Sequence, residues 1–150
     1  MWMGLIFWFS SQPADDSRQM SLSVGHMAGH ILIADYDEWP QQQRESFAEQ
    51  IDYIVRKTAH FTEYAILGVL LMCRGRYYTE KFCTKRNCKN MLLVSGIGVF
   101  YAVTDEIHQL FVRGRSCQFT DVLLDSFGVA AGVAAVCLVA SITAKMKRTE

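Results

Sequence analysis

The sequence lacks the features that mark several common classes of protein. Its five cysteines are an odd number, and Cys83 and Cys88 have no second cysteine–histidine pair nearby, so neither a disulfide framework nor a structural zinc site is expected. No HExxH motif, nucleophile elbow, internal repeat or low-complexity tract occurs. Acidic and basic residues number 15 each, so the net charge does not identify a partner. The apolar content, 51% of the residues, is therefore the main signal.

Long apolar runs predict an all-α, multi-pass membrane protein. The runs with the roughly 20 residues that a membrane-spanning helix needs are 54–73, 91–112 and 122–144. Segment 1–11 is as apolar but about half as long, and it lacks the basic start and cleavage site of a signal peptide. Gly128 and Gly132 have the four-residue spacing that lets helix backbones approach closely. We expect one domain over residues 1–150 with about four transmembrane helices, the first of them truncated.

Two amphipathic helices are predicted in the outer segment 12–53. Pro13 and Pro40 punctuate this segment, and apolar residues recur at helical spacing after each proline. We place both helices on the extracytoplasmic surface, with their apolar faces against lipid or against the other helices, and expect the second to run straight into the next span. His26 and His30 are four residues apart on the first helix, and without nearby acids we expect both to face solvent.

The distribution of basic residues predicts the orientation. Residues 74–90 form a loop whose charged residues are all basic except Glu80, and a basic tail at 145–148 follows the last span. Because basic residues favour the cytoplasmic side, we expect the loop and both chain ends in the cytoplasm and segment 12–53 outside. The apolar runs on both sides of the loop argue against nucleic acid as its partner.

Ionisable residues are dense within the apolar sequence between residues 100 and 125. In the predicted topology these residues lie at the outer membrane face, level with the start of the 54–73 span. Each buried charge costs roughly 2.5–3.5 kcal/mol on insertion scales, so such groups should be paired, hydrated or functional. The residues of this polar cluster, which are the candidate ligand-binding residues, are Arg56, His60, Glu63, Asp105, Glu106, His108, Gln109, Arg115, Asp121 and Asp125.

The residues alone leave three interpretations of the polar cluster open. The first is a network of hydrogen bonds and ion pairs that fixes helix packing. The second is a binding site for a lipid head group or a peptide carboxylate, with Arg113 and Arg115 offering the fork geometry that anions prefer. The third is a metal or hydrolytic centre. Its candidate ligands for a divalent metal are His60, Glu63, Asp105 and His108, and its candidate catalytic bases are Glu63 and Asp105.

Three blocks of the sequence resemble the VanZ-like family of bacterial membrane proteins. They are RKTAHFTEYAILG at 56–68, YAVTDEIHQLFVRGR at 101–115 and DVLLDSFG at 121–128, and the opening FWFSSQP at 7–13 accompanies them. The resemblance implies a small protein, usually of four transmembrane helices, in the bacterial cytoplasmic membrane. It also implies that the signature polar residues are those of the polar cluster together with Lys57. Arg113 departs from the proline that the family commonly has there, which adds a charge to the turn.

The founding member of this family is associated with low-level resistance to the glycopeptide antibiotic teicoplanin. We therefore expect an envelope protein that binds or shields a lipid or peptidoglycan-related component at an extracytoplasmic polar site and contributes to teicoplanin-type resistance. The alternative is a membrane-embedded enzyme, with or without a divalent metal, that acts on a lipid-linked or peptide substrate. Binding is favoured over catalysis, and the lipid bilayer is the expected partner.

Overall fold

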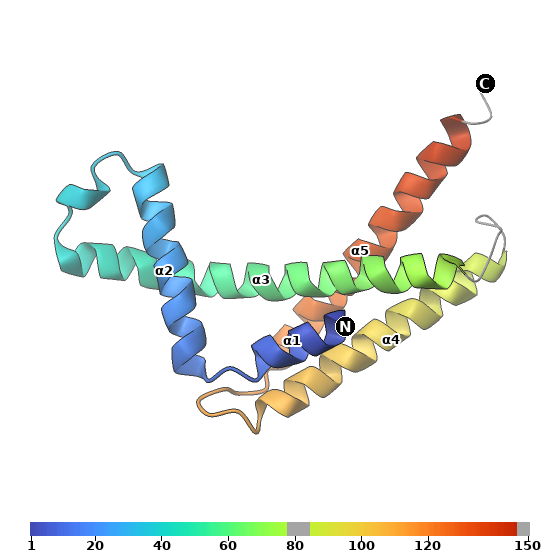
Figure 1. Ribbon diagram of the computed structural model, residues 1–150, viewed down its shortest axis with the longest axis horizontal. Helices are drawn as coiled ribbons and strands as arrows, with labels where there is room; N and C mark the ends of the chain where they lie inside the picture. The colour runs from blue at the N-terminus through green and yellow to red at the C-terminus, as the bar shows by residue number, and fades with distance from the viewer. Residues whose placement is uncertain (78–84, 147–150) are drawn as a thin grey trace.

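The computed structural model describes residues 1–77 and 85–146, and these residues form helices joined by short turns. In chain order the described elements are α1 (Trp2–Ser10), α2 (Ala14–Leu32), the 3-10 turn η1 (Tyr36–Glu38), α3 (Gln41–Tyr77), α4 (Lys85–Gln109) and α5 (Phe119–Met146) (Figure 1). No strand occurs in the described part of the chain. The predicted all-α fold class is confirmed.

α3 is one continuous helix of 37 residues and provides the long axis of the molecule (Figure 1). At 1.5 Å per residue it is roughly 55 Å long. No proline or glycine occurs between residues 41 and 67, so nothing in the chain interrupts the helix there. The predicted outer helix therefore continues directly into the 54–73 segment, as expected.

The turn between α4 and α5 is longer than predicted. α4 ends at Gln109 and not at Val112, because the amides of Leu110 to Val112 bond to carbonyls only three residues earlier. Gly114 then takes a φ of 75°, a left-handed conformation that glycine adopts without steric cost. α5 begins at Phe119 and not at 122, because the carbonyl of Gln118 already accepts the amides of residues 121 and 122.

α3 and α5 cross in close contact (Figure 1). A Cβ atom added at Gly132 would collide with the backbone of Ala65 and lie 2.9 Å from the amide nitrogen of Val69. A Cβ atom at Gly128 would lie 2.6 Å from the carbonyl oxygen of Phe61. The two glycines of α5 thus allow the backbone contact that their four-residue spacing predicted.

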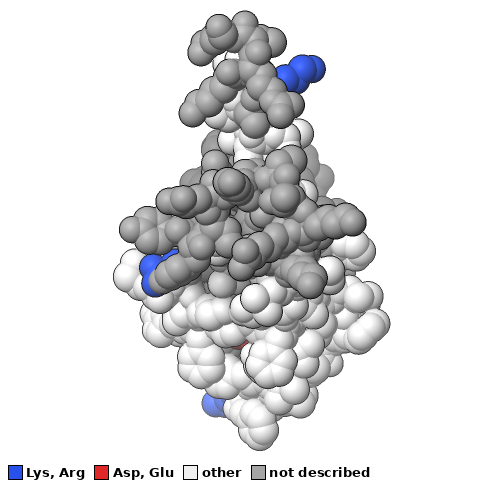
Figure 2. Space-filling model, turned by 90° about the vertical axis from the view of Figure 1, so that its right-hand side faces the viewer, with Lys and Arg blue, Asp and Glu red and all other residues white. Residues whose placement is uncertain are grey.

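Two of the described helices are long and apolar enough to cross a membrane. They comprise Met91–Gln109 of α4 and Phe119–Thr143 of α5. Large apolar side chains on these helices are exposed, among them Phe100 and Phe127 at 70% and 67%. Figure 2 shows a face on which the described side chains are nearly all uncharged. An exposed apolar surface of this kind suits a lipid environment.

The number of membrane spans beyond these two helices, and the orientation of the chain in the membrane, remain predictions. α1 has only nine residues, and α3 does not meet the same requirement of length and apolar composition. The centre of the predicted basic loop, residues 78–84, and the chain end, 147–150, lie outside the described residues.

α2 folds back across α3, and η1 closes the connection between them (Figure 1). His26 Nδ1 lies 2.9 Å from the hydroxyl of Tyr36, and His30 Nδ1 lies 3.1 Å from a carboxylate oxygen of Asp37. The prediction that both histidines face solvent without nearby acids is wrong for half-buried His26, and it overlooked the acid beside His30. The reason is that η1 brings residues 36–38 back over the end of α2.

Candidate functional site

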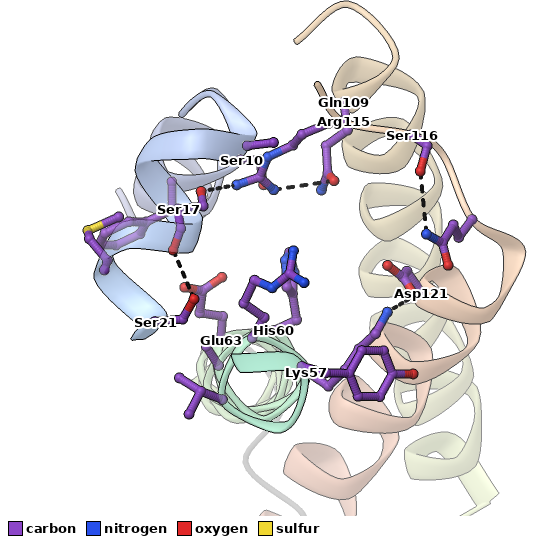
Figure 3. A pocket seen from close by; sticks show the side chains of 18 of the residues that line it. Ser10, Ser17, Ser21, Lys57, His60, Glu63, Gln109, Arg115, Ser116 and Asp121 are labelled. Atoms are coloured by element: carbon purple, nitrogen blue, oxygen red, sulfur yellow. Dashed lines mark hydrogen bonds and ion pairs between the residues drawn. The ribbon is translucent and has the colours of Figure 1, made fainter. Parts of the chain in front are cut away.

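A cavity of about 400 Å³ lies between the N-terminal helices, α3 and the α4–α5 turn (Figure 3). Its polar lining residues are Ser10, Ser17, Ser21, Arg56, Lys57, His60, Glu63, Gln109, Arg115, Ser116, Gln118 and Asp121. Its apolar lining residues are Phe9, Ala14, Met20, Val24, Tyr53, Val55 and Ala59. The cavity therefore offers both hydrogen-bonding groups and apolar surface to a ligand.

The cavity brings together part of the predicted polar cluster. Arg56, His60 and Glu63 lie on one face of α3 because their spacings of four and three residues match the helical repeat. Figure 3 shows His60 and Glu63 rising from α3 toward the wall that carries Arg115. Gln109, Arg115 and Asp121 also line the cavity, as does Lys57. Asp105, Glu106, His108 and Asp125 lie outside the cavity lining.

Arg115 enters the cavity from the α4–α5 turn and is held by neutral acceptors. Its Nε donates to the backbone oxygen of Gln12 at 3.0 Å, and its Nη2 donates to Ser17 Oγ at 2.6 Å. Its Nη1 donates to Gln109 Oε1 at 3.3 Å. Arginine carries five N–H donors, so some remain for a ligand. Burial lowers the pKa of Arg115 and the charge of Asp105 opposes this, but an arginine keeps its charge in proteins.

The other two basic residues of the cavity wall are already paired. Lys57 forms an ion pair with Asp121 at the start of α5. Arg56 pairs with Asp52, one turn earlier on α3, at 2.9 Å. Among the described residues, no carboxylate forms an ion pair with Arg115. Arg115 is therefore the cation of the cavity wall that an anionic ligand could engage without displacing a carboxylate.

Asp105 lies behind the cavity and connects two of its walls. The residue is only 2% exposed, and its Oδ2 accepts hydrogen bonds from Ser10 Oγ at 2.6 Å and from Gln109 Nε2 at 3.3 Å. Because Gln109 also accepts a hydrogen bond from Arg115, a continuous chain of hydrogen bonds runs from Arg115 to Ser10. This chain holds α1, α4 and the α4–α5 turn in register.

Glu106 and His108 point to other neighbours. Glu106 Oε2 accepts the backbone amide of Gln118 at 3.1 Å, which fixes the approach to α5. His108 stacks on Phe7 with a centroid distance of 4.2 Å, and its Nε2 lies 3.2 Å from Ser11 Oγ. Both residues thus bind segments that flank the cavity, and their contacts position those segments.

His60 faces a buried carboxylate on the side away from the cavity. Asp125, on α5, is fully buried, and its Oδ1 lies 4.0 Å from His60 Nδ1. Neither oxygen of Asp125 nor His60 Nδ1 has a hydrogen-bond partner in the described structure. Buried polar groups without partners are rare in folded proteins, so this pair requires an explanation.

Glu63 is the carboxyl group of the cavity wall without a partner. Its side chain forms no hydrogen bond or ion pair with the described residues, whereas its backbone oxygen accepts Trp2 Nε1 at 2.9 Å. The indole contact fixes the position of α1 against α3. The cavity therefore presents a guanidinium on one wall and an unpaired carboxyl group on another.

The described residues do not form the metal centre that was the third interpretation of the polar cluster. Within residues 1–77 and 85–146, no three His, Cys, Asp or Glu side chains lie where they could hold a metal ion. Of the candidate ligands, His60 and Glu63 line the cavity, while Asp105 and His108 are bound to groups on and beside α1. The helices that carry these four residues pack together, but the side chains point in different directions around their helices.

Sequence reasoning missed the N-terminal wall of the cavity. Ser10, Ser17 and Ser21 line it, and Gln12 contributes a carbonyl oxygen to Arg115. Of these, Ser10 and Gln12 belong to the FWFSSQP block that carried part of the resemblance. Arg113, which was expected to join Arg115 in binding an anion, is exposed and lies outside the cavity lining.

The comparison with known families agrees with the fold and with the residue blocks that form the site. A model of the VanZ/LLP1 family matches residues 1–140, a range that contains every residue lining the cavity. No curated protein and no solved structure matches the chain. The described residues thus form the all-helical fold of a membrane protein, and the chain belongs to the VanZ/LLP1 family.

Proposed function

We propose that this protein binds an anionic amphiphile of the bacterial envelope in the cavity between α1, α2, α3 and the α4–α5 turn. The observation that carries the proposal is the state of Arg115. Its guanidinium is held inside the cavity by three neutral acceptors, and among the described residues it has no carboxylate partner. A partly buried cation of this kind is stabilised by an anionic ligand, and the guanidinium fork matches phosphate and carboxylate groups.

The apolar wall of the cavity supports an amphiphile rather than a small inorganic anion. Met20 and Val24 on α2 and Tyr53 on α3 line the cavity, and each is also substantially exposed on the outer surface. Apolar surface therefore continues from the cavity to the outside of the α2–α3 hairpin. An acyl or prenyl chain could follow these side chains while its head group contacts Arg115.

The remaining charges suit a head group with a strong negative charge. Lys57 and Arg56 are paired with carboxylates, so they contribute little net attraction at close range. The side chains of Arg115 and Gln109 are hydrogen-bonded to each other, and we place the anionic group beside them. We assign the cavity to the extracytoplasmic side of the cytoplasmic membrane, in line with the basic loop and tail.

The binding proposal predicts that Arg115→Gln weakens binding of a phosphate-bearing amphiphile on the order of tenfold or more, since a hydrogen bond to a charged group contributes roughly 1.5–3 kcal/mol. The probe is dihexanoyl phosphatidic acid, with dihexanoyl phosphatidylcholine for comparison. Binding to the full chain in detergent is measured by titration calorimetry. Arg113→Gln is the matched control, because Arg113 is an exposed arginine of the same turn.

Arg115→Lys separates binding from folding, because it keeps the charge and loses the fork. We expect it to elute as a folded species in size-exclusion chromatography and to bind phosphatidic acid several-fold more weakly. Equal binding by Arg115→Gln and the unaltered protein would overturn the proposal. So would equal losses in Arg113→Gln and Arg115→Gln, because a general surface-charge effect would then explain both.

We also propose that occupancy of the cavity contributes to teicoplanin-type resistance, a role that fits membership of the VanZ/LLP1 family. Expression in a teicoplanin-sensitive bacterium is expected to raise the inhibitory concentration of teicoplanin several-fold. Arg115→Gln at the same membrane abundance should not raise it. If both proteins raise the inhibitory concentration equally, resistance does not depend on the cavity.

A further inference from the structure

We propose that the cavity hydrolyses phosphomonoester head groups, with His60 as the nucleophile and Asp125 as the residue that positions it. The inference rests on the proposed binding of an anionic head group at Arg115, and it adds a reaction to that binding. It starts from the pair of buried groups that the binding proposal leaves unexplained.

His60 and Asp125 form a pair with one side in the protein interior and the other at the cavity. The Asp125 carboxylate is fully buried, and neither of its oxygens has a hydrogen-bond partner in the described structure. A complementary group, His60 Nδ1, lies 4.0 Å from Asp125 Oδ1 and is itself buried without a partner. A small movement of either side chain would form a hydrogen bond, and such contacts are often long in structures without substrate.

This arrangement determines which nitrogen of His60 can react. A proton on Nδ1 shared with Asp125 leaves Nε2 unprotonated, on the ring edge away from the carboxylate. The His60 ring also lines the cavity (Figure 3). An unprotonated ring nitrogen beside a site for an anion is a nucleophile that needs no further activation.

The serines of the cavity are engaged in other interactions, which favours His60 as the attacking group. Ser10 donates its hydroxyl proton to Asp105, and Ser21 donates to Asp52. Ser17 accepts a hydrogen bond from Arg115, and Ser116 accepts one from the side-chain amide of Gln118. None of these four hydroxyl groups is hydrogen-bonded to a histidine that could remove its proton, so the arrangement that activates a serine is missing from the described cavity lining.

The other groups facing His60 supply the remaining functions of a phosphate-ester hydrolase. Arg115 can hold the non-reacting phosphate oxygens and stabilise the charge that develops on them. Glu63 lies one turn after His60 on α3 and has no partner among the described residues, so it can transfer protons. Lys57 and Asp121 remain paired beside them.

The proposed reaction has two steps. In the first, the Nε2 electron pair of His60 forms a bond to phosphorus, the bond from phosphorus to the alkyl oxygen breaks, and that oxygen takes a proton from the Glu63 carboxyl group. In the second, water attacks phosphorus, gives a proton to the Glu63 carboxylate, and the P–N bond breaks with its electron pair returning to Nε2. The sum is phosphomonoester plus water giving an alcohol and inorganic phosphate.

The experiment measures phosphate release from dihexanoyl phosphatidic acid by the full chain in detergent, alongside binding of the same lipid. We expect turnover by the unaltered protein and by His30→Ala, which removes an exposed histidine that does not line the cavity. His60→Ala should bind the lipid within a few-fold of the unaltered protein and lose at least about a hundredfold in turnover, a loss in the range typical for a proton-transfer or nucleophilic group. His60→Gln repeats the test if the alanine variant does not fold.

Two further measurements are specific to the proposed roles. Denaturation in alkaline detergent, with lipid that carries radioactive phosphorus, should trap a base-stable, acid-labile label on the protein, which His60→Ala lacks. Asp125→Asn should lower kcat with little change in KM and reduce the trapped label, a pattern that a general loss of stability would not give.

The outcomes separate this inference from the binding proposal. Lipid binding without turnover in the unaltered protein overturns the hydrolase inference and leaves the binding proposal standing. Absence of binding overturns the binding proposal itself. Undiminished turnover in folded His60→Ala, or a label that persists in it, overturns the assignment of His60 as nucleophile.

Discussion

Gly132→Val is expected to prevent the protein from accumulating in a folded form. A Cβ atom at this position would meet the carbonyl oxygen of Ala65 and would lie 2.9 Å from the amide nitrogen of Val69. Both are backbone atoms of α3, so no side-chain rotation can relieve the overlap and the two helices must separate. Overpacking of this kind typically costs about 1–3 kcal/mol and more where the backbone must move. Size-exclusion chromatography and thermal unfolding of detergent-solubilised membranes give the readout.

The matched control for this prediction is Gly96→Val on α4. Gly96 is exposed, and a Cβ atom there would have no neighbour within 4 Å. A surface substitution without lost contacts usually changes stability by less than about 0.5 kcal/mol. If Gly132→Val and Gly96→Val unfold at the same temperature, the close crossing of α3 and α5 does not determine stability.

Asp105→Ala is expected to produce the second large loss. It leaves the hydroxyl of Ser10 and the amide of Gln109 without their acceptor, and Gln109 is one of the groups that hold Arg115. A buried polar group left without a partner costs about 1–3 kcal/mol. We therefore expect a lower membrane abundance, a thermal midpoint lower by at least several degrees, and weaker lipid binding.

Two variants make the Asp105 experiment specific. Asp105→Asn keeps an acceptor oxygen, so its stability should lie close to that of the unaltered protein. Thr104→Ala controls for a change at the neighbouring exposed position, where the hydroxyl donates only to Tyr101 of its own helix. A folded Asp105→Asn that binds the lipid and loses turnover would show that the charge of Asp105 acts through Gln109 and Arg115, because Asp105 itself lies behind the cavity.

The helices and the α3 wall of the cavity could be predicted from the sequence. Apolar runs of spanning length and the spacing of Arg56, His60 and Glu63 both follow from helix geometry, which depends on local sequence alone. A close helix contact at Gly128 and Gly132 was also predicted, because glycines four residues apart create a flat helix surface, but the spacing did not identify α3 as the partner.

The composition of the site could not be predicted in the same way. Asp105 and Glu106 were grouped because the predicted topology places both at the outer membrane face, but successive helix residues differ by about 100° in direction. Asp105 therefore contacts Ser10 on α1, and Glu106 contacts Gln118 at the approach to α5. The N-terminal wall of the cavity was missed because no periodic pattern in the sequence predicts the direction that α2 takes after Pro13.

The continuity of α3 imposes a constraint on chain length. Ala48 and Asp52 contact α2, while His60 and Glu63 line the cavity, and no break in the helix lies between these pairs. One inserted residue would rotate the hairpin contacts by about 100° relative to the cavity and shift them by about 1.5 Å. A protein that keeps both the α2–α3 contacts and the cavity therefore cannot accept an insertion or deletion between residues 52 and 60. Substitutions of outward-facing side chains in the same stretch remain possible.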